Sequence, residues 1–229
     1  MPEAPLPCVE IEPRNKADAA VIWLHGLGAD GHDFAPIAPR LARAAKADVR
    51  FVFPHAPSIP VSLNFGMKMP AWYDIAGPDL RRTRHDEAGI RQSAARIETL
   101  IAREKQRGVA AARIVLAGFS QGGAVALHVA LRHDERLAGL IVLSSYLLLP
   151  EKLETERSAA NRDVPILQCH GTHDPMVPEE RGRACRDALT SLGWPVRYET
   201  WPMEHQVCEE EIDLIGAWLR EQLTPRSPA

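Results

Sequence analysis

The chain has 229 residues, a formal net charge of −3 and a charged fraction of 25%. A chain of this length can bury about 70% of its unfolded surface, so we expect a globular core and no need for disulfides. The 27 basic and 30 acidic residues nearly balance, which excludes a strongly basic nucleic-acid surface. The sequence contains no apolar run of about 18 residues, so we expect no transmembrane segment.

The N-terminal residues lack the basic and apolar regions of a secretory signal. Cysteines stand at positions 8, 169, 185 and 208, and their spacing fits no zinc ribbon. We therefore expect free thiols in a reducing compartment and a cytoplasmic location. The sequence leaves the oligomeric state open, a homodimer included.

Short apolar runs alternate with amphipathic segments through most of the chain. Continuous apolar runs are typical of strands that are buried on both faces of a parallel sheet. Strands are predicted at 21–24, 49–53, 114–117, 140–143, 166–169 and 196–201. Helices are predicted at 85–107, 122–131, 179–192 and 208–223. The alternation predicts an α/β fold, with a mostly parallel sheet and helices on both faces.

These elements predict one domain over residues 19–223, preceded by an N-terminal segment (1–18) and followed by a C-terminal tail (224–229). Within it, the proline-rich but apolar segment 54–78 breaks the alternation. A long loop without regular structure is usually functional or disordered, and the apolar content argues against disorder. The segment is either an irregular connection packed on the core or the wall of an apolar acyl site. In the second case, the substrate-binding side chains would be Leu63, Phe65, Met69 and Trp72.

The strongest motif is Gly-Phe-Ser-Gln-Gly at residues 118–122. It directly follows a predicted strand and begins a helix of small residues, which is the context that a G-x-S-x-G nucleophile motif requires. The glycines leave room for a sharp turn that exposes the serine hydroxyl, and the helix N-terminus stabilises negative charge. The motif therefore predicts Ser120 as a nucleophile.

A serine hydroxyl is a weak nucleophile until a positioned base takes its proton, and the base needs an orienting partner. Asp174 lies in a turn directly after the predicted strand 166–169 and is the candidate acid. Asp163 is a weaker candidate because it precedes that strand. In α/β-hydrolases the triad residues follow in the order serine, acid, histidine, which this arrangement satisfies.

The candidate base is His205, between the last predicted strand and the last helix. His170 and His173 lie beside Asp174 and cannot easily turn back onto it. His128 and His133 lie on or just after the helix that follows Ser120, and we expect them on its surface. His205 is therefore the predicted general base.

Acyl transfer also needs hydrogen-bond donors for the developing oxyanion. The backbone N–H of Gln121, which follows Ser120, is one expected donor. The sequence Leu-His-Gly-Leu-Gly at 24–28 follows an early predicted strand. Its glycines let the backbone turn its amides inward, so the N–H of Leu27 is the second expected donor.

Taken in order, these motifs resemble the phospholipase/carboxylesterase family of α/β-hydrolases, which includes acyl-protein thioesterases and small bacterial carboxylesterases. The matching stretches are 24–28, 54–57, 64–74, 118–123 and 169–178. The resemblance extends over nearly the whole chain. It implies an α/β-hydrolase fold, a triad of Ser120, His205 and Asp174, oxyanion amides from Leu27 and Gln121, and neither a metal nor a cofactor.

The chain departs from the family at Gln206, where the family often has serine after the catalytic histidine. The stretch looks closer to the bacterial esterase branch. We therefore expect a serine carboxylesterase that hydrolyses small acyl esters through an acyl-enzyme. The alternative is an acyl-protein thioesterase or lysophospholipase with the same triad, because nothing here decides between oxygen and sulfur as the leaving atom.

Two readings from other classes remain open. A non-catalytic interaction module could use the apolar segment 54–78 as its partner surface. A metallohydrolase could draw imidazole and carboxylate ligands from the loops after the last strands. Its candidate ligands are His170, His173, Asp174 and His205.

Overall fold

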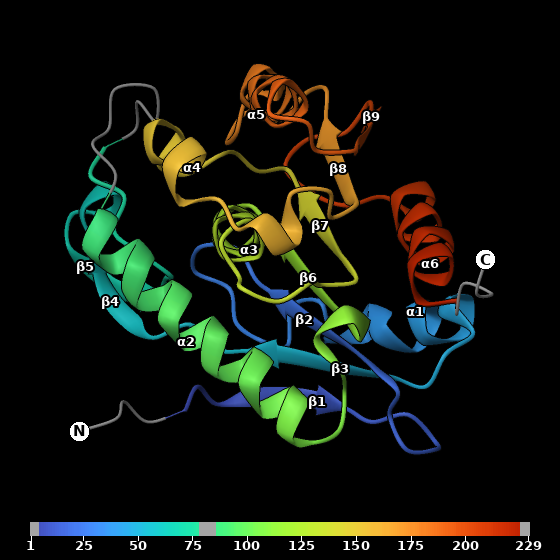
Figure 1. The fold of residues 1–229 in the computed structure, drawn as a ribbon. Coiled ribbons are helices and arrows are strands. Elements are labelled where there is room, and N and C mark those ends of the chain that lie inside the picture. The colour runs from blue at the N-terminus through green and yellow to red at the C-terminus, as the bar shows by residue number, and fades with distance from the viewer. Residues whose placement is uncertain (1–4, 78–85, 225–229) are drawn as a thin grey trace.

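The structure is a computed structural model that describes residues 5–77 and 86–224. Its centre is a seven-stranded sheet with the strand order β1-β3-β2-β6-β7-β8-β9 (Figure 1). The strands are β1 (Cys8–Ile11), β2 (Ala19–Leu24), β3 (Val49–Pro54), β6 (Ile114–Phe119), β7 (Gly139–Leu143), β8 (Ile166–Gly171) and β9 (Val196–Trp201). Within this sheet β1 pairs antiparallel with β3, and the other neighbours are parallel. The predicted α/β fold with a mostly parallel sheet is confirmed.

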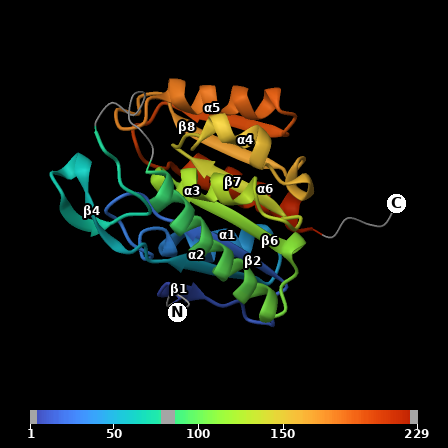
Figure 2. The same ribbon diagram turned by 60° about the vertical axis from the view of Figure 1, so that its left-hand side comes forward.

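Helices cover both faces of the sheet (Figures 1 and 2). On one face, α1 (Ala38–Ala45) packs against α6 (Glu209–Leu223). The other face carries α2 (Glu87–Gln106), α3 (Gln121–Ala130), α4 (Pro150–Glu156) and α5 (Glu179–Ser191). No helix among the described residues is both long and apolar enough to cross a membrane.

Each face of the sheet has its own apolar core. In β2, Ile22 and Leu24 pack toward α2 and α3, whereas Val21 and Trp23 pack toward α1 and α6. Successive side chains of a strand point to opposite faces, so a strand covered on both sides must be apolar throughout. The continuous apolar runs of the sequence therefore become the central strands.

The sheet begins earlier than the predicted domain. Strand β1 lies inside the segment 1–18, which was expected to precede the domain, and it forms the edge of the sheet beside β3. Besides the backbone pairing with β3, Glu10 forms ion pairs with Arg103 of α2 and with Arg107 directly after that helix. These contacts join residues that are more than 90 positions apart, and the half-exposed strand lacks the apolar run that marks the central ones.

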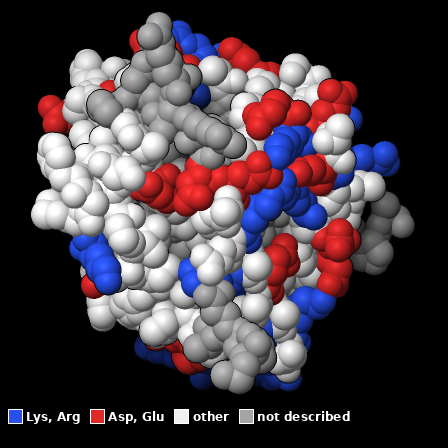
Figure 3. Space-filling view, turned by 90° about the vertical axis from the view of Figure 1, so that its left-hand side faces the viewer, with Lys and Arg blue, Asp and Glu red and all other residues white. Residues whose placement is uncertain are grey.

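The segment after β3 is more regular than expected. Strands β4 (Ser58–Val61) and β5 (Met67–Pro70) form an antiparallel hairpin outside the main sheet. Its turn contains Phe65 and Gly66, both with positive φ. Figure 3 shows the side of the molecule that carries this hairpin and α2: uncharged side chains cover much of its left part, and charged ones gather toward the right.

The residues that follow the hairpin, 71–75, are largely buried and join the core between β2 and α2. The hydroxyl of Ser93 in α2 donates a hydrogen bond to the Trp72 carbonyl there. The far end of the expected loop at Pro78 and the expected helix start at His85 lie outside the described residues.

Candidate active site

Ser120 occupies the sharp turn between β6 and α3. Its backbone has φ 54° and ψ −121°, a region that non-glycine residues rarely adopt. The surrounding structure holds this conformation: the Ser120 N–H donates to the Leu143 carbonyl at 2.8 Å, and the Ser145 hydroxyl donates to the Ser120 carbonyl at 2.6 Å. The turn places Ser120 at the carboxyl end of the central strand β6.

The two glycines of the motif are required by close backbone contacts. A methyl group at Gly122 would overlap the carbonyl oxygens of Leu24 and His25, and one at Gly118 would overlap the backbone of Gly122. The start of α3 can therefore lie directly against the end of β2. This contact brings the loop after β2 beside Ser120.

Asp174 and His205 meet on the loops that follow β8 and β9. Nδ1 of His205 lies 2.7 Å from Oδ2 of Asp174, while Oδ1 of Asp174 accepts hydrogen bonds from the Met176 and Val177 amides at 2.9 and 2.8 Å. Burial alone would raise the pKa of Asp174, but the hydrogen bonds from His205 and the two amides outweigh it and lower that pKa. Asp174 is therefore a carboxylate at neutral pH.

The hydrogen bond to Asp174 determines which nitrogen of His205 can act as a base. A carboxylate only accepts hydrogen bonds, so Nδ1 carries the proton and Nε2 of the neutral ring has the free lone pair. The ring packs against Phe119, with 4.6 Å between the ring centroids, and is partly exposed. Phe119 therefore supports the His205 ring, while part of the ring remains accessible.

Ser120 and His205 line the same cavity, of about 410 Å³. Most of its wall is apolar. The lining residues are Gly26, Leu27, Ala29, Asp33, Leu63, Ile75, Phe119, Ser120, Gln121, Tyr146, Pro175, Met176, Val177 and His205. A reactive pair in an apolar cavity of this volume suits a ligand with one polar centre and a hydrocarbon part.

The two expected oxyanion donors also lie at this cavity. Gln121 is the first residue of α3, where the amide N–H has no partner within the helix. Leu27 lies in the loop after β2, which is fixed on its other side by a hydrogen bond from the Gly28 N–H to the Pro70 carbonyl at 2.9 Å. Both amides are thus carried by anchored backbone close to Ser120.

His25 supports this loop as a neutral ring. Its Nε2 accepts a hydrogen bond from the Ala56 amide at 3.0 Å, so its Nδ1 donates to the Gly26 carbonyl at 2.7 Å. Burial lowers the pKa of His25, which favours the neutral form that this pair of bonds requires. The sequence motif includes His25, but its positioning role emerges only from the fold.

Of the four predicted substrate-binding side chains, the structure places only Leu63 in the cavity wall. Phe65 is 96% exposed at the hairpin turn, where its φ is positive. Trp72 is only 1% exposed; its indole N–H donates to the His25 carbonyl and its amide donates to the Gln121 side chain. Met69 is half-buried beside the loop and lies outside the lining. Phe65, Met69 and Trp72 thus lie outside the lining of this cavity, whereas Leu63 lies in it.

Other residues take their place in the wall. Tyr146 and Ile75 are two that the sequence analysis did not identify. The Tyr146 hydroxyl lies 2.7 Å from that of Tyr73, and the Arg181 guanidinium lies over the Tyr146 ring. No local motif marks them, because they meet only when the segment after β5 crosses the end of β7.

The histidines that were expected to be peripheral are not all on the surface. His128 and His133 are buried, and His133 pairs with Glu98 across the α2–α3 contact. α3 is covered by its neighbours on every side, so the expectation of a surface position was wrong. Burial lowers the pKa of His128 to about 3, and it is neutral at physiological pH.

The ligand set of the metallohydrolase reading comes together only in part: Nε2 of His170 lies 3.7 Å from Oδ2 of Asp174, the oxygen that also contacts His205. His170 is fully buried, with Nε2 2.8 Å from the Val177 carbonyl, whereas His173 is exposed. In the part of the chain that the structure describes, these residues do not form a cluster that could hold an ion.

Comparisons with known proteins agree on one family. Residues 7–223 match the family described as Phospholipase/Carboxylesterase. Acyl-protein thioesterase 1 of Neurospora crassa is 45% identical over 214 residues, covering 90% of this chain and 87% of that protein. The protein of the same name from Gibberella zeae is 42% identical over 217 residues, covering 91% and 92%. The crystal structure of Zea mays acyl-protein thioesterase 2 has a TM-score of 0.84 at 28% identity, covering 95% of this chain and 99% of that one.

Proposed function

Because the chain belongs to the phospholipase/carboxylesterase family, we propose that it is a serine hydrolase acting on acyl thioesters, and on acyl esters with the same residues. The observation that carries the proposal is the shared cavity, in which Ser120 and His205 face an apolar wall. Relatives named acyl-protein thioesterase match about nine-tenths of the chain. They favour the thioester over the small-ester substrate that the residues around His205 suggested.

In the first half of the reaction, Ser120 Oγ attacks the acyl carbonyl carbon while Nε2 of His205 takes the hydroxyl proton. The carbonyl π electrons move to oxygen, and the amides of Leu27 and Gln121 donate to the resulting oxyanion. When the tetrahedral intermediate collapses, the carbon–sulfur bond breaks. His205 gives its proton to the leaving thiol, or to the leaving alcohol of an ester.

In the second half, water takes the place of the leaving group. His205 removes a proton from water as it attacks the acyl carbon, and the same two amides stabilise the second oxyanion. The bond to Ser120 Oγ then breaks, Oγ regains its proton from His205, and the carboxylic acid leaves. Asp174 remains ionised throughout, keeps Nδ1 of His205 protonated and stabilises the imidazolium.

The acyl chain would lie along the apolar wall. Leu63, Ile75, Tyr146 and Val177 surround the cavity beside Ser120. Burying each methylene there gains about 0.8 kcal/mol, so a longer chain binds more tightly until the wall ends. The charged Asp33 at the same cavity disfavours an anionic leaving group on its side.

The test compares kcat/KM for a long-chain S-acyl peptide and a short-chain aryl ester. We expect the S-acyl peptide to be the better substrate. We also expect Ser120→Ala to lose nearly all turnover of both substrates, and Ser191→Ala, a change at an exposed serine of α5, to lose none. A clear preference for the aryl ester would contradict the thioester proposal and favour a small-ester substrate. Activity in the Ser120→Ala variant would contradict the assignment of Ser120 as the nucleophile of a triad.

We also propose that the enzyme works in a reducing cytoplasm. All four cysteines are free, and two of them, Cys169 and Cys185, are buried in the cores. Burial raises the pKa of Cys185 to about 12, which keeps its thiol protonated and unreactive.

A further inference from the structure

A group of metal-binding side chains lies beside the candidate active site but takes no part in the proposed chemistry. Asp30 and His32 belong to the loop after β2, and His55 directly follows β3. Because β2 and β3 are parallel neighbours, their carboxyl ends meet at the same edge of the sheet. One ligand atom from each of the three side chains lies within 4.8 Å of those of the other two.

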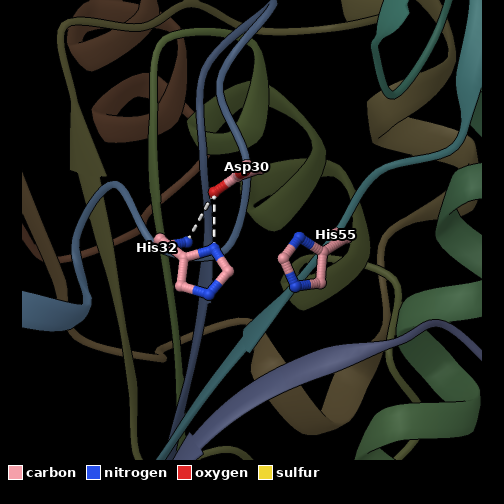
Figure 4. Close-up of side chains that lie close together, drawn as sticks. All are labelled: Asp30, His32 and His55. Atoms are coloured by element: carbon pink, nitrogen blue, oxygen red, sulfur yellow. Dashed lines mark hydrogen bonds and ion pairs between the residues drawn. The ribbon is translucent and has the colours of Figure 1, made fainter.

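The three side chains turn toward one another (Figure 4). Oδ1 of Asp30 accepts a hydrogen bond from the His32 amide at 2.8 Å and lies 3.1 Å from Nδ1 of His32. The rings of His32 and His55 are 5.3 Å apart between centroids. The figure shows them facing each other, with the Asp30 carboxylate directed at His32.

These ligands are the set that a divalent transition metal prefers. Two imidazoles and one carboxylate suit Zn²⁺, and they suit Mg²⁺ or Ca²⁺ poorly. In a tetrahedral zinc site with bonds of 2.0–2.2 Å, the ligand atoms are about 3.4 Å apart. Asp30 and His32 already have that spacing, so His55 alone has to approach.

Ion binding exchanges hydrogen bonds at both histidines. Nδ1 of His32 gives up the proton that faces Oδ1 of Asp30, and this proton is released to solvent. His55 also has to exchange a partner. Its Nδ1 accepts a hydrogen bond from the Gly31 amide at 3.2 Å. Coordination through Nδ1 replaces that bond with a bond to the ion. Asp30 and His32 are 51% and 72% exposed, so an ion can enter from solvent, and water can complete its coordination.

We propose that Asp30, His32 and His55 form a binding site for Zn²⁺ or a similar transition-metal ion, separate from Ser120 and His205. The ion joins the loop after β2 to the end of β3. That loop also contributes Leu27, Ala29 and Asp33 to the cavity wall. The site therefore stabilises the loop that carries the expected oxyanion donor, and no step of the hydrolysis passes through the metal.

The test measures Zn²⁺ binding to untagged, chelator-treated protein by calorimetry, together with the Tm at saturating Zn²⁺. We expect Zn²⁺ to bind and to raise Tm, and Mg²⁺ to do neither. His32→Asn and Asp30→Asn should each weaken Zn²⁺ binding by roughly tenfold or more and remove most of the Tm increase. His32→Asn should keep the basal turnover of the metal-free enzyme.

The matched control is His173→Asn, which removes an exposed histidine outside this group. It should bind Zn²⁺ as the parent does. Equal binding by the parent and His32→Asn would overturn the proposal, because the ion would then bind elsewhere, for example at His205. An absence of binding up to about 1 mM Zn²⁺ would overturn it too, and would leave the three side chains as a hydrogen-bonded surface group.

Discussion

Nδ1 of His205 lies 2.7 Å from Oδ2 of Asp174, and this contact joins the loops after β8 and β9. The other carboxylate oxygen is engaged as well, since Oδ1 accepts two backbone hydrogen bonds from Met176 and Val177. A carboxylate held at both oxygens cannot rotate. The orientation of the His205 ring is therefore fixed by the backbone of the loop after β8.

Replacing Asp174 with asparagine tests this relationship. The side chain keeps its shape, but its amide can donate to Nδ1 of His205 and thereby stabilise the wrong tautomer. We expect Asp174→Asn to lower kcat by about 10³–10⁴-fold, with a much smaller change in KM. Steady-state kinetics on the long-chain S-acyl peptide measures both.

Asp163→Asn is the control for this change. Asp163, the rival acid of the sequence analysis, is exposed and pairs with Arg136 at the surface. We expect its kcat to match that of the parent. If Asp174→Asn kept its activity within about tenfold, Asp174 would not be the partner of the catalytic base.

Leu63 and Phe65 are only two residues apart but face different surroundings. Leu63 lines the cavity and Phe65 is exposed. We expect Leu63→Ala to reduce the discrimination between long and short acyl chains, by about 1–3 kcal/mol in kcat/KM. Phe65→Ala should leave that discrimination unchanged, because no part of the cavity wall is lost.

The measurement is kcat/KM across a series of aryl esters of increasing chain length, for the parent and both variants. The opposite pattern, in which Phe65→Ala alone changes the preference, would show that the hairpin turn contacts the acyl chain during turnover. The cavity wall would then differ from the one described here.

Local patterns were enough to predict the central sheet. Continuous apolar runs marked β2, β6, β7 and β8 because those strands are buried on both faces. Strand β1 carries no such mark, since it is a half-exposed edge strand that pairs with β3 on one side only. The β4–β5 hairpin was not predicted, because proline within a segment argues against a strand. Pro60 lies within β4 and Pro70 at the end of β5.

In the candidate site, too, some residues could be predicted from local sequence and others could not. Ser120, Asp174 and His205 each follow a predicted strand, so position along the chain was enough to bring them to one edge of the sheet. The lining of the cavity depends on tertiary packing instead. Trp72 is apolar and near Ser120 in space, yet its hydrogen bonds to His25 and Gln121 place it behind the cavity wall.

Gln121 is predicted to act through its side chain as well as its backbone. Its Oε1 accepts from the Trp72 amide at 2.9 Å, and its Nε2 donates to the Tyr73 carbonyl at 2.8 Å. Gln121→Ala leaves two buried backbone groups without partners, at about 1–3 kcal/mol each. We expect the free energy of unfolding, measured in urea, to fall by about 2–4 kcal/mol.

Gln106→Ala, at the exposed end of α2, is the matched control and should change stability little. The backbone N–H of residue 121 is retained in the alanine variant. Any loss of kcat would therefore come from movement of the segment 71–75 against the cavity. A Gln121→Ala protein as stable as the parent would mean that water replaces both hydrogen bonds.

Glu211 predicts an unusual dependence of stability on pH. It lies in the first turn of α6, fully buried and close to Cys169 and Cys208. Burial raises the pKa of Glu211 to about 8, against a smaller opposing influence of the Cys208 backbone and the Cys169 side chain, and neither carboxyl oxygen has a hydrogen-bond partner among the described residues. An unfolded glutamate has a pKa of about 4.3, so the folded protein holds a proton that the unfolded chain has already lost between these two values.

Stability therefore falls as pH rises from about 4.3 to about 8, because the folded state binds more protons over this window. This contribution is fully present below the unfolded pKa and is lost once Glu211 ionises in the folded protein. Its size is on the order of 5 kcal/mol, from the difference between the two pKa values. Glu211→Gln cannot ionise, so we expect it to be more stable than the parent at about pH 9 and similar to it at about pH 5.

Urea unfolding of the parent, Glu211→Gln and Glu210→Gln at these two pH values tests this prediction. Glu210 is the exposed neighbour, so its variant should follow the parent at both. Suppose that Glu211→Gln shows the same difference in unfolding free energy between the two pH values as the parent. The pH dependence of stability would then come from another group. If instead this difference in unfolding free energy shrinks only for Glu211→Gln, the buried proton belongs to Glu211. The first turn of α6 then contains a neutral carboxyl group.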